Sequence, residues 1–329
     1  MRTIFAFAAA LGLSAVSLTL PQAKAADAPL RWAYPIYARP ANAPMPPPVN
    51  EAELKRVPNS TLAVTLERSR SAFNVPDWHP DDHPPAPDVI LRGRRSDVEG
   101  CAHCHLPNGL GTTILQAPGL AGLSVAYITQ QIAEFKSGVR KSAMEKYSGT
   151  GTMTFVSRPM NEDDTRIAAE YFAALKPKPW FRVVESARVP TTRTEDLMSV
   201  KADTDTTEAL GTRIIEVPED FERTQLRDSR SGFVAYVPPG SIKRGEVLVT
   251  TGRKGTTTPC ATCHGADLQG IGPVPLLAGR SPTYIVRQLY DIQQGARAGA
   301  WSALMVPVVA KLTETDMVDI AAYAASRMP

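Results

Sequence analysis

The pentapeptide Cys-x-x-Cys-His occurs twice in this chain of 329 residues, and its two copies contain all four cysteines. This spacing is typical of c-type haem attachment, because two thiols one helical turn apart can each add to one vinyl group of a single haem. The histidine that follows then lies under the ring, where its imidazole can ligate the iron. We therefore predict two covalently attached haem c groups, held by Cys101 and Cys104 and by Cys260 and Cys263, with His105 and His264 as axial ligands.

Three other uses of four cysteines remain open. Two disulfides can form in principle, but a bond between positions i and i+3 closes a very small loop and leaves the histidines unexplained. A thioredoxin-like redox site requires a parallel β-α-β pattern, which the sequence does not show. A four-cysteine zinc site fits the number of thiols. However, Cys104 and Cys260 are 156 positions apart, against about 15–20 residues in a zinc ribbon.

The N-terminus has the composition of a secretory signal peptide. Met1 and Arg2 form a short basic start, residues 3–20 are apolar, and residues 21–25 end in a small-x-small pattern. We predict cleavage after Ala25 and a periplasmic protein. The mature chain has no apolar run of about 18 residues, so no transmembrane segment is expected. Loss of the two basic residues of the leader lowers the net charge from +3 to +1, which gives no indication of nucleic-acid binding.

An internal repeat follows each Cys-x-x-Cys-His motif and predicts two helical units of the same design. Each motif is followed by a loop, a middle helix with a one-sided apolar stripe, and a closing helix that begins at a capping residue. The middle helices are expected at 124–138 and 281–295, and the capping residues of the closing helices are Asn161 and Thr313.

The repeats divide the mature chain into four parts. We predict an N-terminal extension at 26–85, a first haem domain at 86–179, a connector at 180–240 and a second haem domain at 241–329. The extension is rich in proline, which opposes helix and favours extended chain, and we expect it to wrap over a domain. Strand-like runs at 181–184, 213–217 and 232–237 predict a small β-ribbon in the connector. The predicted fold class is mainly α.

The second axial ligand of each iron is expected at matching places in the two repeats. Met153 and Met305 each lie eight residues before the capping residue of a closing helix, and this shared spacing predicts that they are the sixth ligands. The alternative is that both side chains fill apolar gaps, which is the commoner role of methionine. In the same register Met160 pairs with Leu312, so Met160 is predicted to be a core residue.

Two further histidines, His79 and His83, are four positions apart. On a helix this spacing would suit a metal ion. The neighbouring residues Pro80 and Pro84 oppose a helix. The expected environment of both histidines is therefore a solvated loop.

At these residues the chain resembles the two-haem class I cytochromes c of the tandem c-four type, related to cytochrome c553. The resemblance covers residues 86–179 and 241–329 and rests on the haem motifs, the Pro-x-Leu-Ala-Gly loops and the methionine approaches to the closing helices. It implies two tandem class I cytochrome c domains. It also implies that the carbonyls of Pro118 and Pro275 hold the second ring nitrogen of the ligating histidines. The long extension and connector depart from that family's pattern, so the relative placement of the haems stays open.

The sequence thus predicts a carrier of single electrons with two His/Met haems and no open coordination position for a substrate. Its expected partners are periplasmic or membrane-bound redox proteins: a dehydrogenase, a reductase or an oxidase. One alternative is an enzyme like the two-haem cytochrome c peroxidases, which requires an open haem and nearby acid–base groups. The matched methionines argue against it. Another is an electron-accepting subunit of a periplasmic dehydrogenase, which the extra segments suggest.

Overall fold

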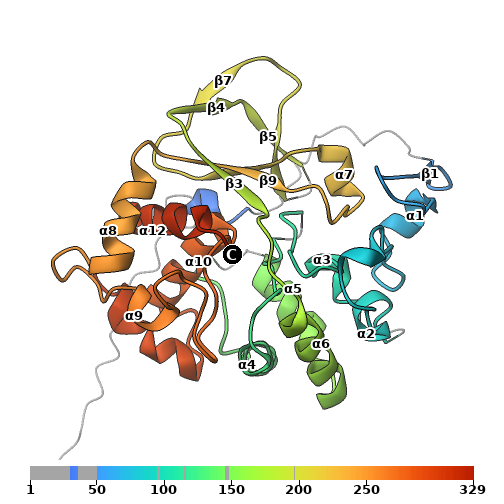
Figure 1. Cartoon of the computed structure of the whole chain (residues 1–329), viewed down its shortest axis with the longest axis horizontal. Coiled ribbons are helices and arrows are strands. Elements are labelled where there is room, and N and C mark those ends of the chain that lie inside the picture. The colour runs from blue at the N-terminus through green and yellow to red at the C-terminus, as the bar shows by residue number, and fades with distance from the viewer. Residues whose placement is uncertain (1–29, 36–49, 95–96, 115, 145–147, 196) are drawn as a thin grey trace, which may run out of the picture.

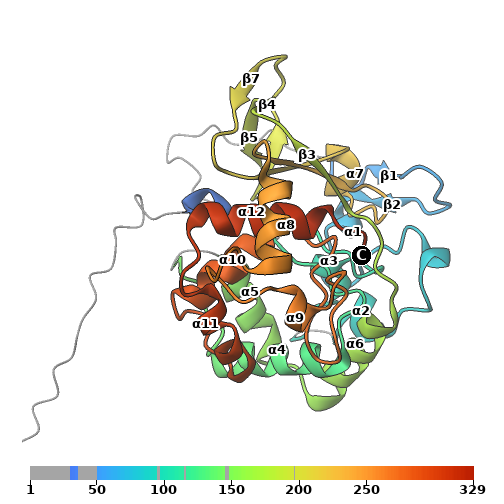
Figure 2. The same cartoon turned by 60° about the vertical axis from the view of Figure 1, so that its left-hand side comes forward.

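The structure is a computed structural model, and it describes residues 30–35, 50–94, 97–114, 116–144, 148–195 and 197–329. The predicted signal peptide at 1–25 lies outside the described residues. Within them, no helix is both long and apolar enough to cross a bilayer. Figures 1 and 2 show two groups of helices side by side, with the strands of the connector lying over one end of both.

The first helical unit has the predicted middle and closing helices. Ser124 caps the middle helix by accepting a hydrogen bond of 3.2 Å from the Tyr127 amide, and Gly138 ends it in the left-handed region with φ 72°. Asn161 and Asp164 form a reciprocal capping box at the start of the closing helix. The unit contains α2 (Asp88–Leu91), α3 (Ala102–His105), α4 (Val125–Ser137), α5 (Ser148–Ser157) and α6 (Glu162–Ala174).

The second helical unit repeats these caps, with Ser281 before the middle helix and Thr313 in a capping box before the closing helix. It contains α8 (Ser241–Thr251), α9 (Ala261–His264), α10 (Pro282–Gln293), η3 (Ala300–Leu304), α11 (Val306–Val309) and α12 (Glu314–Ser326). Helix α8 crosses α12 so closely that a Cβ at Gly245 would lie 1.9 Å from the Asp319 carbonyl oxygen. The corresponding first helix of the other unit, α2, has only four residues. The repeat is therefore inexact at its start.

The connector forms the predicted β structure and more. Its strands are β3 (Phe181–Glu185), β4 (Arg188–Pro190), β5 (Thr192–Glu195), β6 (Met198–Lys201), β7 (Thr207–Ala209), β8 (Ile215–Pro218) and β9 (Phe233–Val237), with α7 (Phe221–Gln225) before the last. The three predicted runs correspond to β3, β8 and β9, which form one sheet with β9 in the centre. Strand β3 is parallel to β9, and β8 is antiparallel to it. The antiparallel pairs β4–β7 and β5–β6 were not predicted.

The described parts of the extension lie on both units. Residues 30–35, which include η1 (Arg31–Ala33), pack on α10, while residues 50–85 lie beside the first unit and the connector (Figure 1). The Tyr34 hydroxyl donates a hydrogen bond of 2.8 Å to the Asp291 carboxylate of α10. The Trp78 indole donates one of 2.7 Å to the Leu226 carbonyl of the connector. The remaining elements of the extension are β1 (Leu54–Lys55), β2 (Val64–Thr65), α1 (Leu66–Ser69) and η2 (Pro80–Asp82).

One buried hydrophobic cluster runs through both helical units. Phe172 of α6 and Met317 of α12 belong to it, together with Tyr34 from the extension and Phe233 from the connector. Met160 is also in this cluster and only 6% exposed, which confirms its predicted place in the core. Because the core is shared, the two units are expected to support each other's stability.

The predicted solvated loop around His79 and His83 is wrong. His79 is 3% exposed, and its Nε2 lies 2.9 Å from Oδ1 of Asp228. His83 has Nε2 3.2 Å from Asp77 Oδ1 and Nδ1 3.0 Å from the Tyr171 hydroxyl. The connector covers this segment and brings in Asp228, which lies 149 positions away from His79. No cluster of three or more His, Cys, Asp or Glu side chains able to hold a metal ion occurs in the described part of the chain.

Candidate haem sites and the interface between them

Each pair of cysteines lies on one side of a single helical turn. Cys101 and Cys260 are the residues just before α3 and α9, and both have helical backbone angles. The amides of His105 and His264 donate to the carbonyls of these cysteines at 3.0 and 2.9 Å, which closes the turn. Neither pair of cysteines forms a disulfide. This geometry presents two thiols and one imidazole from each turn, which is the donor set that covalent haem attachment requires.

Both histidines of the motifs are buried and oriented in the same way. The Nδ1 atoms of His105 and His264 lie 2.8 Å from the carbonyl oxygens of Pro118 and Pro275, respectively. These two hydrogen bonds confirm the expected role of the prolines. Each carbonyl accepts the Nδ1 proton and leaves the Nε2 lone pair available to a metal. Burial lowers the pKa of both imidazoles, against the smaller opposing effect of the carbonyl, and so favours the neutral form that ligates iron.

Glycines allow the loops after the motifs to fold this tightly. Gly111 and Gly270 both have φ of +80°, a conformation that side chains disfavour. A Cβ at Gly111 would lie 2.5 Å from the Ala117 carbonyl oxygen, and one at Gly270 would lie 2.6 Å from that of Val274. The two loops therefore reach the histidine through the same sterically demanding turn.

The predicted methionine ligands lie in different local structures. Met153 is inside the continuous helix α5, whereas Met305 lies between η3 and α11. The proline at position 307, in the first turn of α11, explains why the second segment is broken into two short helices. Both methionines are partly buried, unlike Met144 and Met160, which are 5% and 6% exposed. The assignment of Met153 and Met305 as iron ligands stays a prediction.

The two units meet through residues that occupy equivalent positions in the repeat. Arg140 donates to Gln131 at 2.6 Å in its own unit and to Gln288 at 3.0 Å in the other. Arg297 donates to Gln288 and Gln131, both at 2.9 Å. The backbones of the two arginines form an antiparallel β-bridge. Arg140 contacts Gln288 of the second unit, and its counterpart Arg297 contacts Gln131 of the first. Because the two units exchange equivalent contacts, the interface is isologous, as in a twofold dimer.

Tyrosines extend this symmetric network. The Arg297 guanidinium donates to the Tyr127 hydroxyl, and that of Arg140 donates to the Tyr284 hydroxyl, both at 3.1 Å. Burial alone would raise the pKa of Tyr127, but the cations of Arg297 and Arg140 outweigh it and hold that pKa below its ordinary value. This interface was not predicted from the sequence. Its signal was the recurrence of tyrosine, glutamine and arginine at the same spacing of 157 positions in both units.

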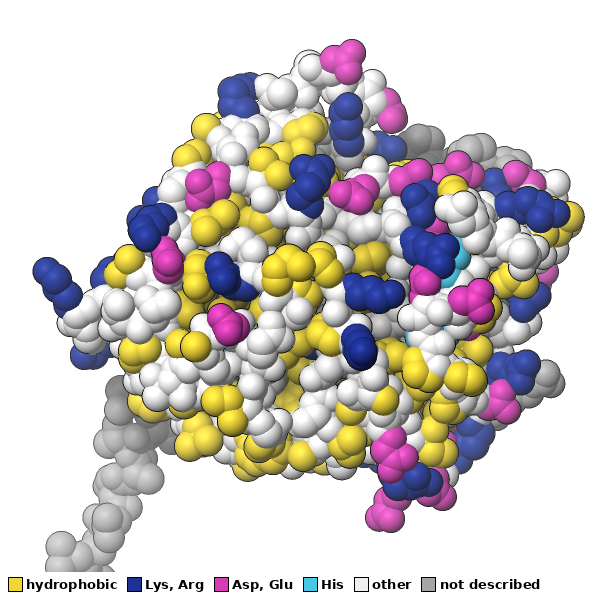
Figure 3. All heavy atoms as spheres, in the orientation of Figure 1, with side chains coloured by type: hydrophobic (Ala, Val, Ile, Leu, Met, Phe, Trp, Pro, Cys, Tyr) yellow, Lys and Arg dark blue, Asp and Glu magenta, His cyan; other side chains and the backbone are white. Residues whose placement is uncertain are grey.

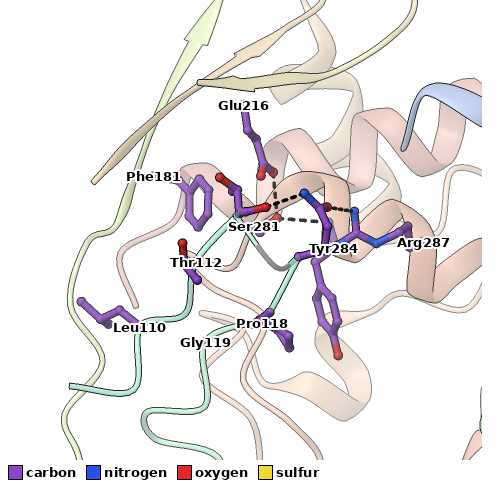
Figure 4. Close-up of a pocket in the computed structure, with 12 residues that line it drawn as sticks. Leu110, Thr112, Pro118, Gly119, Phe181, Glu216, Ser281, Tyr284 and Arg287 are labelled. Atoms are coloured by element: carbon purple, nitrogen blue, oxygen red, sulfur yellow. Dashed lines mark hydrogen bonds between the residues drawn. The ribbon is translucent and has the colours of Figure 1, made fainter. Parts of the chain in front are cut away.

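The connector is joined to the second unit at the start of α10. Figure 4 shows Glu216 of β8 directed at Ser281, beside Phe181 of β3 and Thr112 of the first unit. The Glu216 carboxylate accepts hydrogen bonds from the Ser281 hydroxyl at 2.7 Å and from the Thr283 amide at 2.9 Å. Burial raises the pKa of Glu216, and these donors oppose the rise. Glu216 thus adds a second cap to a helix that already has Ser281.

Comparison with known proteins settles the family. A cytochrome c family profile matches residues 249–327. The cytochrome c4 of Stutzerimonas stutzeri is 35% identical to this chain over 237 residues, which cover 69% of this chain and 83% of that protein. This chain belongs to the cytochrome c4 family. As a cytochrome c4 it has two tandem class I cytochrome c domains, carries two covalently bound haem c groups and transfers electrons.

Two further similarities accompany this cytochrome c4. A "Thiosulfate dehydrogenase electron acceptor" from Thiomonas intermedia is 24% identical over 235 residues, covering 70% of this chain and 80% of that protein. A solved cytochrome c4 structure from Acidithiobacillus ferrooxidans aligns with a TM-score of 0.46 and 23% identity, covering 69% of this chain and 97% of that one.

Proposed function

We propose that this protein carries single electrons between periplasmic redox partners through two haems with His/Met ligation. In this proposal Cys101 and Cys104 attach the first haem, and His105 and Met153 are its axial ligands. Cys260 and Cys263 attach the second, with His264 and Met305 as ligands. The first haem domain comprises residues 86–179 and the second residues 241–329. The observation that carries the proposal is the repeated arrangement of a buried imidazole, fixed by a proline carbonyl, directly after two cysteines that form no disulfide.

The proposed ligands and the groups that hold them would suit each haem site to electron transfer. When bound, the haem iron supplies the one-electron redox couple. The proline carbonyls hold each imidazole in a fixed orientation, so the ligand does not have to reorganise when the charge of the site changes. With a histidine and a methionine both bound to it, each iron would have no free position for a substrate, which supports a carrier and argues against a peroxidase-like enzyme.

A second proposal concerns the partner. A relative from Thiomonas intermedia is described as an electron acceptor of thiosulfate dehydrogenase, and it matches 70% of this chain. We propose that this protein likewise accepts electrons from a periplasmic dehydrogenase, after export by the predicted signal peptide. Mixing the purified protein with a thiosulfate dehydrogenase and thiosulfate tests this. Thiosulfate-dependent reduction of both haems supports the proposal, and reduction no faster than without the dehydrogenase contradicts it.

Replacement of the methionines tests the ligand assignment. Met153→Ala and Met305→Ala should each leave both haems attached, because attachment depends on the cysteines. Each should lower the near-infrared methionine-to-ferric charge-transfer band by about half, since each haem contributes one such bond. The potential of the affected haem should fall. Pyridine haemochrome analysis, near-infrared absorption and a redox titration measure the three quantities.

Met160→Ala is the matched control. It should keep the full charge-transfer band while lowering the free energy of unfolding by about 2–5 kcal/mol, because Met160 is a core residue. Loss of the band in Met160→Ala but not in Met153→Ala would show that the repeat register is wrong. If no methionine of the first unit affected the band, the first haem would have a different ligand, and the peroxidase alternative would gain support.

A further inference from the structure

The loops that carry the two histidines differ sharply in exposure. In the first unit every residue from His105 to Ile114 is buried. In the second unit the corresponding loop has six exposed residues: Ala266, Asp267, Gln269, Ile271, Gly272 and Pro273. The contrast is clearest where the loops begin to diverge, since Thr112 is 4% exposed and its counterpart Ile271 is 57% exposed.

The connector produces this difference by covering the first loop. The Asn108 side chain donates to the Ser229 carbonyl at 2.9 Å, and the Trp180 indole donates to the Gly111 carbonyl at 3.1 Å. Ile114 packs with Met198, which is 2% exposed, in a small hydrophobic cluster. These partners come from three separate parts of the connector, so the cover is extensive.

The second loop has no comparable cover among the residues that the structure describes. Its one side-chain hydrogen bond to a distant segment runs from Gln269 to the Met328 carbonyl at 2.8 Å, and Met328 is itself 69% exposed. Ile271, Pro273 and Met328 therefore give this face an apolar character. Asp267 is the one charged residue between positions 265 and 273. Figure 3 shows mainly hydrophobic and uncharged atoms at the lower left of the molecule, where Figure 1 places the neighbouring helix α9.

We propose that protein partners exchange electrons with this cytochrome at the second unit, by docking on the exposed loop at 266–273. The inference rests on the proposed function. The loop is continuous with the haem motif at one end, and at the other it holds His264 through Pro275. A partner bound to this loop would thus lie within a few residues of His264, the proposed iron ligand. The connector closes the equivalent approach to the first unit, which would receive its electrons through the second.

The partner that fits this surface is a redox protein with an apolar contact face that carries little charge. The loop offers a single carboxylate and no cation, so it cannot select a strongly charged partner. The net charge of the mature chain, +1, also gives little long-range steering. The association should therefore depend weakly on ionic strength.

Adsorption on two defined surfaces tests the proposal with the whole haem-containing protein. Gold coated with a methyl-terminated alkanethiol imitates an apolar partner, and a carboxylate-terminated coating imitates a charged one. We expect stronger adsorption on the methyl surface. Ile271→Glu should weaken that adsorption about tenfold, because it replaces an apolar contact with a charge. Leu54→Glu is the matched control. Leu54 is 63% exposed on β1 of the extension, and this change should alter adsorption by less than about twofold.

Voltammetry of the adsorbed protein identifies the haem that faces the surface. Met305→His should lower the potential of the second haem and so label its wave. The faster wave on the methyl surface should be the labelled one. If Met153→His shifts the faster wave instead, or Leu54→Glu weakens adsorption as much as Ile271→Glu, the proposal is wrong.

Two solution measurements keep the possible failures apart. A redox titration of each variant must first show two haems, and fewer would contradict the proposed function itself. Sedimentation of the wild-type protein tests whether a second copy occupies the loop. A dimer that Ile271→Glu abolishes would assign the surface to self-association and overturn the proposal. A monomer at all concentrations, with the adsorption pattern described, supports it.

Discussion

Tyr34→Phe should show how strongly the N-terminal extension holds the two helical units together. Tyr34 is fully buried, and its hydroxyl donates to Oδ1 of Asp291 at 2.8 Å. The same oxygen accepts a hydrogen bond of 2.8 Å from the Ala143 amide of the first unit. One carboxylate oxygen thus joins the extension, the first unit and the second unit. The substitution removes one donor from it and leaves the ring in place.

The expected loss follows from the charge of the acceptor. A hydrogen bond to a charged group contributes about 1.5–3 kcal/mol, and we expect a loss of about 2 kcal/mol in the free energy of unfolding at neutral pH. For a chain of this size, with about 2.1 cal/mol/K of unfolding entropy per residue, that corresponds to a fall of roughly 3 °C in the thermal midpoint. Circular dichroism in the far ultraviolet measures the midpoint. Tyr290→Phe is the matched control. Its ring packs edge-on against Tyr34 at 6.3 Å, and its hydroxyl has no hydrogen-bond partner among the described residues.

The loss should also depend on pH. Burial raises the pKa of Asp291, and the Ala143 amide and the Tyr34 hydroxyl oppose that rise. An acid with a raised pKa stabilises the fold below its unfolded value and loses that contribution as the pH rises through the folded value. Without the Tyr34 donor the pKa rises further, so the variant loses more stability than the wild type on going from about pH 4 to pH 7. A loss below about 0.5 kcal/mol, or one that is the same at both pH values, would refute the reasoning.

Two other substitutions test features of the second unit and its connector. Gly245→Ala should lower the free energy of unfolding by about 1–3 kcal/mol, because the added methyl group would clash with the α12 backbone. Gly151→Ala in α5, where a Cβ has no neighbour within 4 Å, should instead be neutral or add up to about 1 kcal/mol, and denaturant titration compares the two. Glu216→Gln should have the same thermal midpoint as the wild type near pH 5 and a higher one near pH 8. The reason is that burial raises the pKa of Glu216, so the wild type loses stability as this carboxyl group ionises. Equal midpoints for wild type and variant at both pH values would contradict this.

Features set by neighbouring residues could be predicted from the sequence. The caps at Ser124, Asn161 and Thr313 form within one turn of the chain, so the residue types alone specify them. The haem motifs are equally local. The proline carbonyls that orient the two histidines lie 13 and 11 positions away, and the family resemblance, rather than any local rule, pointed to them.

Features made by distant segments could not be predicted in this way. His79 is buried because Asp228 reaches it from the connector, and no pattern near either residue shows the contact. The interface of Arg140 and Arg297 lies between these cases. A polar residue repeated at equal spacing on two helical units has no place in a core, so its recurrence points to a contact between the units. This contact was not predicted because Gln131 lies within the apolar stripe of the middle helix and was interpreted as part of it.

The parallel pairing of β3 with β9 limits how the chain could be shortened. Phe181 lies beside Phe233 and Glu185 beside Val237, so the connector leaves the sheet at one end and returns at the other. Excising the insert by joining Glu185 to Phe233 would have to bridge about 13 Å with one peptide bond. The β4–β7 pair is different, because Pro190 and Thr207 are direct partners across an antiparallel ladder. A deletion of the residues between them, closed by a short turn, would keep that ladder, but it would remove Met198 and Val200 from their buried contact with Ile114. The β4–β7 pair could therefore be closed without disturbing the sheet, at the cost of uncovering the first haem loop, whereas the three-stranded base is part of the path between the two haem domains.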